Sequence, residues 1–402
     1  MKRSQKIITD EGSDPKSQNT IRVGVLVPSS NVALEPELYS LASHLRGVTI
    51  HFARVPVTKI TLDQSDSNQF TIQPMIDAGK LLCDAGVDVI VWGGTSGSWL
   101  GLEHDYKLVD ELQKALKVPA TTASLGLINA CHAFGVKRVS IVTPYISQVN
   151  AAIEARYRDE EIDVISTASL GITRNRDFGD VGHEDIISLI RKSNTDKTEA
   201  ILVVCTNLRA TSLVAQMELS LGIPVFDSIG VTLLTAIRTA GSSMTIPNSG
   251  ALMAQGCLRT DLQLLSKHLL ALTSADRVTI RVDIAPLNID VNLPVAEATL
   301  PHVKRISSDS TLDQRALSTI KWLEEFRIPL IQRLFDGEPR PPLALEQTYG
   351  VKAQMLAPIE YNEKLIGWVS VHSLVEREWS SNDQFALQNA ARQALLLIVK
   401  TI

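Results

Sequence analysis

Short apolar runs rich in β-branched residues alternate with helical stretches from Ile21 onward, and this alternation limits the possible folds more than any other feature. The runs are IRVGVLV, VTIHFARV, VDVIVW, RVSIVT, DVISTASL and AILVVC. Strands separated by helices form parallel sheets, because the connection between two parallel strands has to cross back over the sheet. The pattern therefore predicts an α/β domain.

Four of these runs form a weak internal repeat. IRVGVLVPSSN (21–31) is echoed by VDVIVWGGTSG (87–97), and KRVSIVTPYIS (137–147) by EAILVVCTNL (199–208). Each run ends in small or polar residues before a helix. Because α/β proteins bind ligands at the carboxyl ends of parallel strands, we expect two pseudo-symmetric lobes with the active site between them.

The chain of 402 residues is longer than one core usually organises. The turn-forming stretch SSMTIPNSG (242–250) precedes an amphipathic helix, LRTDLQLLSKHLLALT (258–273). Beyond it we expect a strand at 277–284, two helical stretches within 311–335, paired strands within 353–373 and a last helix over 381–400. The predicted divisions are a disordered tail (1–20), an α/β domain (21–242), a linker and helix (243–275) and an α+β domain (276–402).

Composition argues against several classes of partner. The net charge is -5, and no long block of like charges indicates binding to nucleic acid or to an anionic membrane. No apolar stretch is long enough to span a bilayer. Four cysteines without CxxC or Cys/His spacing indicate neither a disulfide scaffold nor a metal site, so we expect a cytoplasmic protein.

Cys205 is the cysteine best placed to react, because it follows a strand and precedes a helix start. Backbone N–H groups at such a position favour the thiolate, so we expect a lowered pKa. Hydroxyl, amide and backbone donors at the matching strand ends can hold a carboxylate or an enolate oxygen. These donors are Thr95, Ser96, Ser98, Tyr145, Thr206, Asn31 and Asn175.

Structural interpretations of the same residues stay open. A cysteine at a strand end can simply be packed, and Gly94 can serve a tight turn. Tyr145 can be an edge aromatic, and Asn31 and Asn175 can be helix caps or turn formers. The sequence lacks GxSxG, HExxH and a glycine-rich phosphate loop, which argues against a serine hydrolase, a zinc enzyme or a nucleotide enzyme.

Five ordered motifs resemble the maleate isomerase and arylmalonate decarboxylase branch of the aspartate/glutamate racemase superfamily. They are VPSSN (27–31), GGTSGS (93–98), TPYISQVN (143–150), GITRNRDFG (171–179) and CTNLRA (205–210). The resemblance implies a cleft between lobes that takes a small dicarboxylate, without metal or organic cofactor. It also implies that carboxylates are held by Asn31, Tyr145 and Asn175, with Pro28, Ser30, Gly94, Thr206 and Asn207 beside them.

The resemblance further implies two reactive positions on opposite faces of the substrate. Both are cysteines in the isomerases, whereas Gly94 occupies the first position here and leaves room for a substituent. A single thiol suffices for decarboxylation, since loss of carbon dioxide generates the carbanion that Cys205 protonates. Thr95, Ser96, Tyr145 and the Thr206 backbone would stabilise the enediolate. We therefore expect a decarboxylase of a substituted malonate; the PSSN signature and Asn175 match the isomerases, so an isomerase or racemase and a non-catalytic dicarboxylate sensor remain alternatives.

The C-terminal part resembles a GAF module. The resemblance is carried by MLAPIEYNEKLIGWVSVHS (355–373) and EREWSSNDQFALQNAARQA (376–394). It implies either a ligand-binding module or a packing and dimerisation module that forms a homodimer. In the second case Trp322, Trp368 and Trp379 would be core residues.

Overall fold

The structure is a computed structural model that describes residues 20–63, 68–307, 309, 311–333 and 338–401. The predicted disordered tail, up to residue 19, lies outside the described residues. Within them, no helix combines the length and apolarity needed to cross a membrane.

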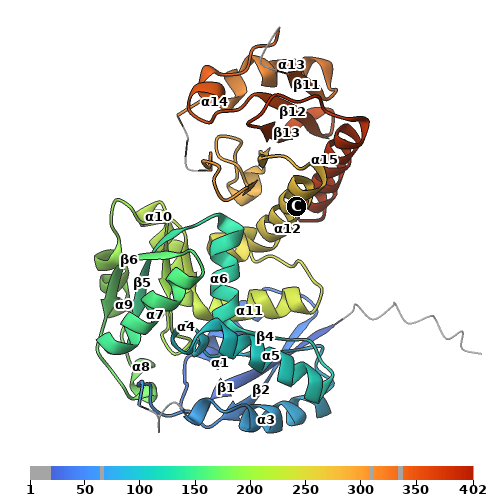
Figure 1. The fold of residues 1–402 in the computed structure, drawn as a ribbon. Coiled ribbons are helices and arrows are strands. Elements are labelled where there is room, and N and C mark those ends of the chain that lie inside the picture. The colour runs from blue at the N-terminus through green and yellow to red at the C-terminus, as the bar shows by residue number, and fades with distance from the viewer. Residues whose placement is uncertain (1–19, 64–67, 308, 310, 334–337, 402) are drawn as a thin grey trace, which may run out of the picture.

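Two four-stranded parallel sheets with the same strand order build the N-terminal part. The first has the order β2-β1-β3-β4 and contains β1 (Ile21–Pro28), β2 (Val48–Val55), β3 (Val89–Trp92) and β4 (Ala120–Thr122). The second has the order β6-β5-β7-β8 and contains β5 (Arg138–Thr143), β6 (Asp163–Ser169), β7 (Ala200–Val203) and β8 (Val225–Asp227). The predicted α/β fold with two pseudo-symmetric lobes is confirmed, and Figure 1 shows the lobes side by side.

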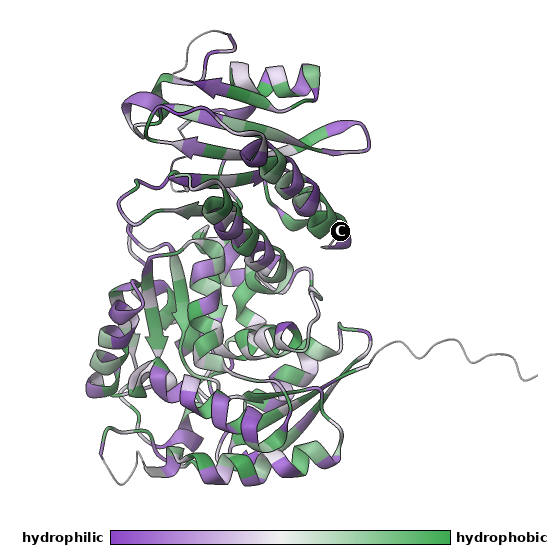
Figure 2. Cartoon of the chain, turned by 45° about the vertical axis from the view of Figure 1, so that its right-hand side comes forward, coloured by the Kyte–Doolittle hydropathy of each residue, from purple (hydrophilic) through white to green (hydrophobic). Residues whose placement is uncertain are grey.

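Helices follow the strands and cover the sheets. They are α1 (Leu34–Ala42), α3 (Ile72–Asp84), α4 (Gly97–Leu100), α5 (Leu102–Leu116), α6 (Ala123–Phe134), α7 (Ser147–Asp159), α8 (Asn175–Phe178), α9 (His183–Ser193), α10 (Val214–Leu221) and α11 (Ser228–Thr239). Strands β3 and β7 consist of apolar residues that are all buried, as in parallel sheets covered by helices on both faces; Figure 2 shows the hydropathy along the chain. One hydrophobic core therefore runs through both lobes.

Helix α12 (Ala251–Thr273) belongs to two cores. Its first turns place Leu252, Met253 and Cys257 in the core of the lobes, and Leu258 and Leu262 begin the core of the C-terminal domain. The predicted helix started at residue 258, whereas the observed one begins at 251. A single continuous helix thus joins the lobes to the C-terminal domain (Figure 1).

The C-terminal domain contains a five-stranded antiparallel sheet of order β10-β9-β13-β12-β11. Its strands are β9 (Arg277–Val282), β10 (Ala296–Thr299), β11 (Leu330–Arg333), β12 (Ala353–Tyr361) and β13 (Lys364–Ser373). Helices α12 and α15 (Ser381–Thr401) pack on one face, and the segment with α13 (Ser318–Phe326) and α14 (Leu343–Gln347) connects the strands. The second helical stretch predicted within 311–335 was wrong: residues 330–333 form an edge strand, paired with β12.

Candidate active site

Residues from both lobes meet at the carboxyl ends of the central strands. The Thr206 hydroxyl, just after β7, donates a 2.8 Å hydrogen bond to the carbonyl of Gly93, just after β3. The amide of Asn31, beyond β1, donates to the Thr206 carbonyl at 3.1 Å and to its hydroxyl at 3.2 Å. These residues are buried, so they form a polar seam between the lobes.

The side-chain amide of Asn207 strengthens this seam. Its oxygen accepts from the backbone N–H groups of Val32 (2.9 Å) and Ala33 (3.1 Å), and its nitrogen donates to the Asn175 carbonyl at 2.5 Å. The Asn31 side-chain oxygen accepts from Ala33 and Leu34 at the start of α1, as a helix cap does. Asn31 and Asn207 thus fix the geometry of the strand ends.

Asn175, at the start of α8, lies at the same seam. Its side-chain nitrogen donates to the Ser30 hydroxyl at 2.8 Å, and Ser30 donates to the Val57 carbonyl at 2.6 Å. The carbonyl of Pro28 accepts from the Asn31 backbone N–H at 2.8 Å and closes the turn after β1. The structure therefore brings Pro28, Ser30, Asn31 and Asn175 together.

The Tyr145 hydroxyl joins the reactive groups of the two lobes. It lies 3.0 Å from the hydroxyl of Thr95 and also hydrogen-bonds with the Cys205 thiol. Burial, with the neighbouring thiol, raises the pKa of Tyr145 well above its usual value, so the phenol stays protonated and able to donate. Thr95, Tyr145 and Cys205 thus form one hydrogen-bonded row.

The Cys205 thiol is 2 % exposed, and burial raises its pKa to about 12. The Asn207 backbone N–H, 3.3 Å from the sulfur, and the Tyr145 hydroxyl act in the opposite direction but do not outweigh desolvation. The expected lowering of this pKa was wrong, because burial dominates over the partial charge of the helix start. Cys205 is a thiol at neutral pH and therefore a proton donor.

Gly94 does not leave open space at the matching position. A Cβ atom built on Gly94 would lie 2.5 Å from two carbons of the Trp92 indole, far inside van der Waals contact. The indole N–H donates to the Ser96 hydroxyl at 3.0 Å and holds the ring in place. The expectation of room for a substituent is corrected: Trp92 fills the volume that a side chain at residue 94 would take.

Aromatic rings line the side of the row that faces α4 and α8. Tyr145 packs edge to face against Trp99 and Phe178, with ring centroids 5.3 and 5.5 Å apart, and Trp99 packs in the same way against Phe70. Sequence reasoning missed Phe70 and Phe178 as site residues. Phe178 lies inside GITRNRDFG and could have been found from that motif, whereas the sequence around Phe70 carries no such signal.

The two-sheet architecture and its polar seam define a class of two-lobed α/β domains with a buried site between the lobes. The arylmalonate decarboxylase family model matches residues 23–253, and a GAF domain model matches residues 258–398. The chain therefore belongs to the arylmalonate decarboxylase family and carries a GAF domain.

Curated relatives cover the N-terminal part. Arylmalonate decarboxylase from Bordetella bronchiseptica is 28% identical over 219 residues, which are 54% of this chain and 86% of that protein. Maleate isomerase from Alcaligenes faecalis is 22% identical over 252 residues, 58% of this chain and 97% of that protein. One of these relatives is a decarboxylase and the other is an isomerase.

Solved structures agree on the fold. The match to maleate isomerase from Pseudomonas putida, whose structure was determined with maleate, covers 58% of this chain and 97% of that chain. Its sequence identity is 22% and its TM-score is 0.54. A Nocardia farcinica maleate cis-trans isomerase mutant with a covalently bound succinylcysteine intermediate covers 59% and 99% at 20% identity and a TM-score of 0.55.

Proposed function

We propose that this chain is a cofactor-independent decarboxylase of a substituted malonate, in which Cys205 alone protonates the enediolate. One observation carries the proposal: the reactive row holds one thiol, kept protonated by burial, and the matching strand end holds Gly94 under the Trp92 indole. An acid on one face is sufficient for decarboxylation, whereas racemisation needs an acid and a base on opposite faces.

The chemical step follows from these groups. The carbon–carbon bond to one carboxylate breaks, carbon dioxide leaves, and the electron pair passes into the remaining carboxylate as an enediolate. Hydroxyl groups of Thr95, Ser96 and Tyr145 and backbone donors at Thr206 stabilise its oxygens. The Cys205 S–H bond then breaks as a new C–H bond forms, and the thiolate regains its proton from water.

The aromatic cluster supplies the apolar half of the site. Loss of carbon dioxide is faster where the leaving carboxylate is poorly solvated, and Tyr145, Trp99 and Phe178 form such a surface. The same rings fit an aryl or alkyl substituent. The retained carboxylate is held at the seam by Asn31, Asn175 and Asn207, with Ser30 and the Pro28 turn. Asn31, Asn175 and Asn207 exchange their present hydrogen bonds to Thr206, Ser30 and the Asn175 carbonyl for bonds to the carboxylate.

Substrate reaches this site through an opening motion. Cys205 and Tyr145 are each 2 % exposed and Asn31 is 1 % exposed, so the lobes have to separate at the seam before a dicarboxylate enters. Closure then excludes water from the enediolate, which otherwise takes its proton from either face. A single configuration of product is the expected result.

A maleate-type isomerase is the second candidate. The VPSSN motif and Asn175 favour it, and several relatives are maleate isomerases. In the Nocardia farcinica structure a cysteine is covalently bound to the substrate carbon skeleton as succinylcysteine. The protonated state of Cys205 and the Trp92 indole over Gly94 argue against the same chemistry here. A non-catalytic dicarboxylate sensor is the outcome if no turnover occurs.

The test is proton NMR of the full-length protein in deuterated water with 2-aryl malonates, 2-alkyl malonates and maleate in separate tubes. A one-thiol decarboxylase gives a monoacid with a single deuterium in one configuration. Fumarate formed from maleate would replace the proposal with the isomerase. Saturable binding without any product would replace it with the sensor.

A further inference from the structure

The C-terminal sheet has an apolar face and a polar face, and both are buried. Val278, Ile280, Val369 and Val371 belong to the core that the sheet shares with α12 and α15. The alternate residues of the same strands point to the other face and are 0 to 5 % exposed; they are Arg277, Thr279, Arg281, Gln354, Ser370 and His372. Burying so many polar groups is costly unless partners satisfy them.

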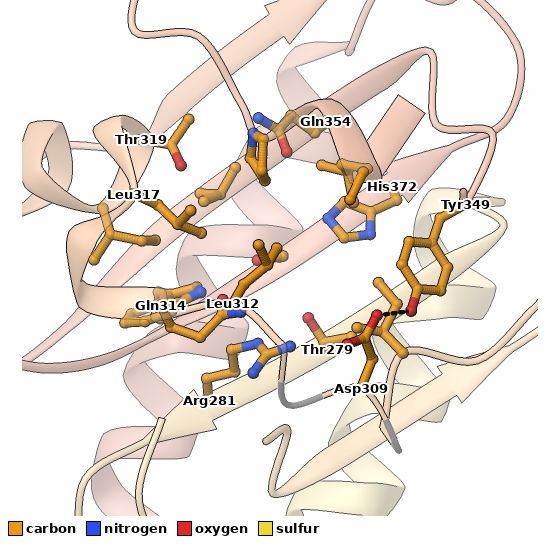
Figure 3. A pocket seen from close by; sticks show the side chains of 18 residues that line it. Thr279, Arg281, Asp309, Leu312, Gln314, Leu317, Thr319, Tyr349, Gln354 and His372 are labelled. Atoms are coloured by element: carbon orange, nitrogen blue, oxygen red, sulfur yellow. Dashed lines mark hydrogen bonds between the residues drawn. The ribbon is translucent and has the colours of Figure 1, made fainter. Parts of the chain in front are cut away.

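Strand pairing places these residues in adjacent rows. His372 pairs with Arg277 and with Gln354, Ser370 pairs with Thr279, and Trp368 pairs with Arg281. Described residues between β10 and β12 cover this face and leave a partly open pocket of about 70 Å³, lined by Thr279, Arg281, Ser370 and His372 from the sheet (Figure 3). That volume suits a ligand of a few heavy atoms and is too small for a nucleotide.

Several polar groups at the pocket lack a hydrogen-bond partner among the described residues. They are the Nδ1 atom of His372, the hydroxyls of Thr279 and Ser370, and the amide of Gln314. Buried polar groups in native proteins are almost always hydrogen-bonded. Several such groups around one pocket indicate a polar ligand.

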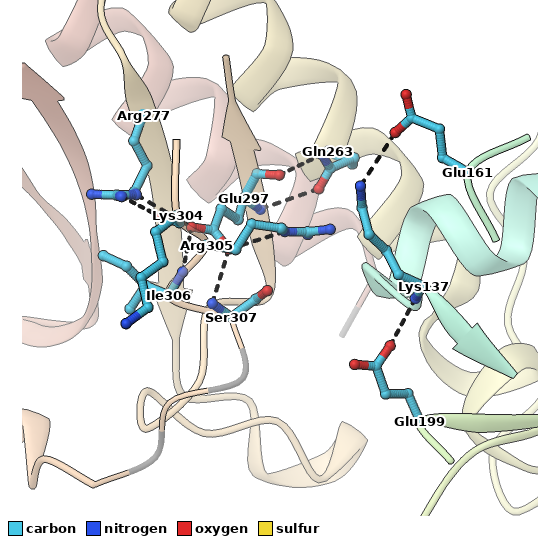
Figure 4. A network of polar contacts seen from close by, with 10 residues as sticks. All are labelled: Lys137, Glu161, Glu199, Gln263, Arg277, Glu297, Lys304, Arg305, Ile306 and Ser307. Atoms are coloured by element: carbon cyan, nitrogen blue, oxygen red, sulfur yellow. Dashed lines mark hydrogen bonds and ion pairs between the residues drawn. The ribbon is translucent and has the colours of Figure 1, made fainter. Parts of the chain in front are cut away.

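The charges around the pocket favour an anion. Glu297 is shared by two arginines, Arg277 and Arg305, each 3.5 Å away, and it also accepts from the backbone of Ile306 and Ser307 (Figure 4). Arg281 donates only to backbone carbonyls in the described chain, those of Val291 and Asn292. Arg281 lines the pocket and, among the described residues, has no carboxylate within ion-pair distance.

Two titratable groups complete the electrostatics of the pocket. Asp309 hydrogen-bonds with Thr311 and Tyr349, which lower its pKa to about 2, so it is an anion at the edge of the pocket. His372 stays neutral, because burial and the two arginines hold its pKa well below the usual value. The remaining wall is apolar and includes Leu312, Leu317, Leu356 and Trp368.

We propose that this pocket binds a small organic monocarboxylate, with the carboxylate on Arg281, His372, Thr279 and Ser370 and the hydrocarbon part against Leu317 and Trp368. The ligand supplies acceptors to the unpaired donors and balances the arginine charge. Its apolar end fits the wall, which inorganic anions do not use. The proposal concerns a second site and does not depend on the reaction at Cys205.

Isothermal titration calorimetry of the full-length protein with butyrate, and with butyramide as the neutral analogue of similar size, tests the proposal. Butyrate is expected to bind with saturation, and butyramide at least about tenfold more weakly, because charge-assisted hydrogen bonds to arginine are lost. Ser370→Leu fills the pocket and should abolish butyrate binding. Arg281→Met should weaken it by roughly 10- to 100-fold.

Two control variants locate the binding. Arg259→Met removes a partly buried arginine, on α12 outside this pocket, which hydrogen-bonds with Gln255 and Val295; it should leave butyrate affinity unchanged. Asn175→Ala alters the seam between the lobes and should also leave it unchanged. Binding lost in Asn175→Ala but retained in Ser370→Leu would assign butyrate to the first site and overturn the proposal. The proposal would also be overturned if butyramide bound as tightly as butyrate, or if the folded wild-type protein showed no saturable binding of butyrate.

Discussion

The ends of β3 and β7 occupy equivalent places in two sheets of identical order, yet they carry different chemistry. After β3 the chain reads Gly93–Gly94–Thr95, and after β7 it reads Val204–Cys205–Thr206. Thr95 hydrogen-bonds with Tyr145, and Thr206 with the Gly93 carbonyl. The threonines thus hold similar polar positions in both lobes, and the residue before each threonine makes the difference.

That residue determines which face of a substrate can receive a proton. Cys205 offers a buried thiol in contact with Tyr145, whereas Gly94 offers only the indole of Trp92 behind it. Two lobes with the same fold can therefore both keep hydrogen-bond donors for carboxylate oxygens, while only one of them carries the group that transfers a proton. The following predictions test this asymmetry in order of decreasing effect.

Cys205→Ser should produce the largest loss. Serine keeps the approximate shape but is a far weaker acid, so the proposed protonation step should slow by about 10³-fold or more. The rate is measured by NMR as monoacid formed from the best malonate of the panel. Normal turnover by Cys205→Ser would exclude the thiol as the proton donor.

Cys131→Ser is the matched control for that variant. Cys131 is also buried, and burial raises its pKa to about 12 as well, but it lies inside α6 within the hydrophobic core. We expect Cys131→Ser to lower the free energy of unfolding without changing turnover of the folded protein. A comparable loss of rate in both variants would point to damage of the fold.

Tyr145→Phe should have the next largest effect. It removes the hydroxyl that lies between Thr95 and Cys205 while it keeps the ring packed against Trp99 and Phe178. Loss of one oxyanion donor typically costs about 10²-fold in kcat. Tyr157→Phe, which removes a buried hydroxyl 3.4 Å from that of Ser98, should leave kcat nearly unchanged; equal losses in both variants would remove Tyr145 from the proposed role.

Gly94→Cys tests the other side of the comparison. The new Cβ overlaps the Trp92 indole, so the free energy of unfolding should fall by about 1–3 kcal/mol, as in overpacked cores. Trp92→Leu in the same chain should restore part of this loss and allow the second thiol to racemise the product. Chemical denaturation and chiral analysis of the product measure the two effects. Unchanged stability of Gly94→Cys alone would show that Trp92 does not block the position.

Much of the fold could be predicted from the sequence, because buried parallel strands read as continuous apolar runs. Four of the six apolar runs form the internal repeat. That repeat predicted the two parallel sheets of matching strand order. Strands β4 and β8 are three residues long, too short for a periodic signal. Strand β11 was mistaken for a helix because its residues LIQR follow the amphipathic helix α13 and form only an edge strand.

The candidate site could be predicted only in part. The polar residues that end each strand do meet, because the carboxyl ends of parallel strands share one edge. The pKa of Cys205 could not be predicted, since it depends on how completely both lobes bury the sulfur. The position of the Trp92 ring could not be predicted, because nothing in VWGGTS indicates that the ring lies over Gly94. The unpaired groups around His372 required the strand register of the C-terminal sheet.

The dependence of kcat on pH should be the smallest effect. It distinguishes Cys205 as a proton donor from Cys205 as a nucleophile. A thiol that acts as an acid with a folded-state pKa of about 12 stays protonated, so its step should be nearly independent of pH below 9. A thiolate nucleophile predicts a rate that rises as pH increases. Stability has the opposite sign: the unfolded thiol ionises near its usual value of 9.0 while the folded one keeps its proton, so the contribution of Cys205 to stability falls between pH 9 and about 12. Wild type and Cys205→Ser should therefore converge in stability as pH rises through that window, and a kcat that climbs across neutral pH would assign Cys205 to nucleophilic rather than acid catalysis.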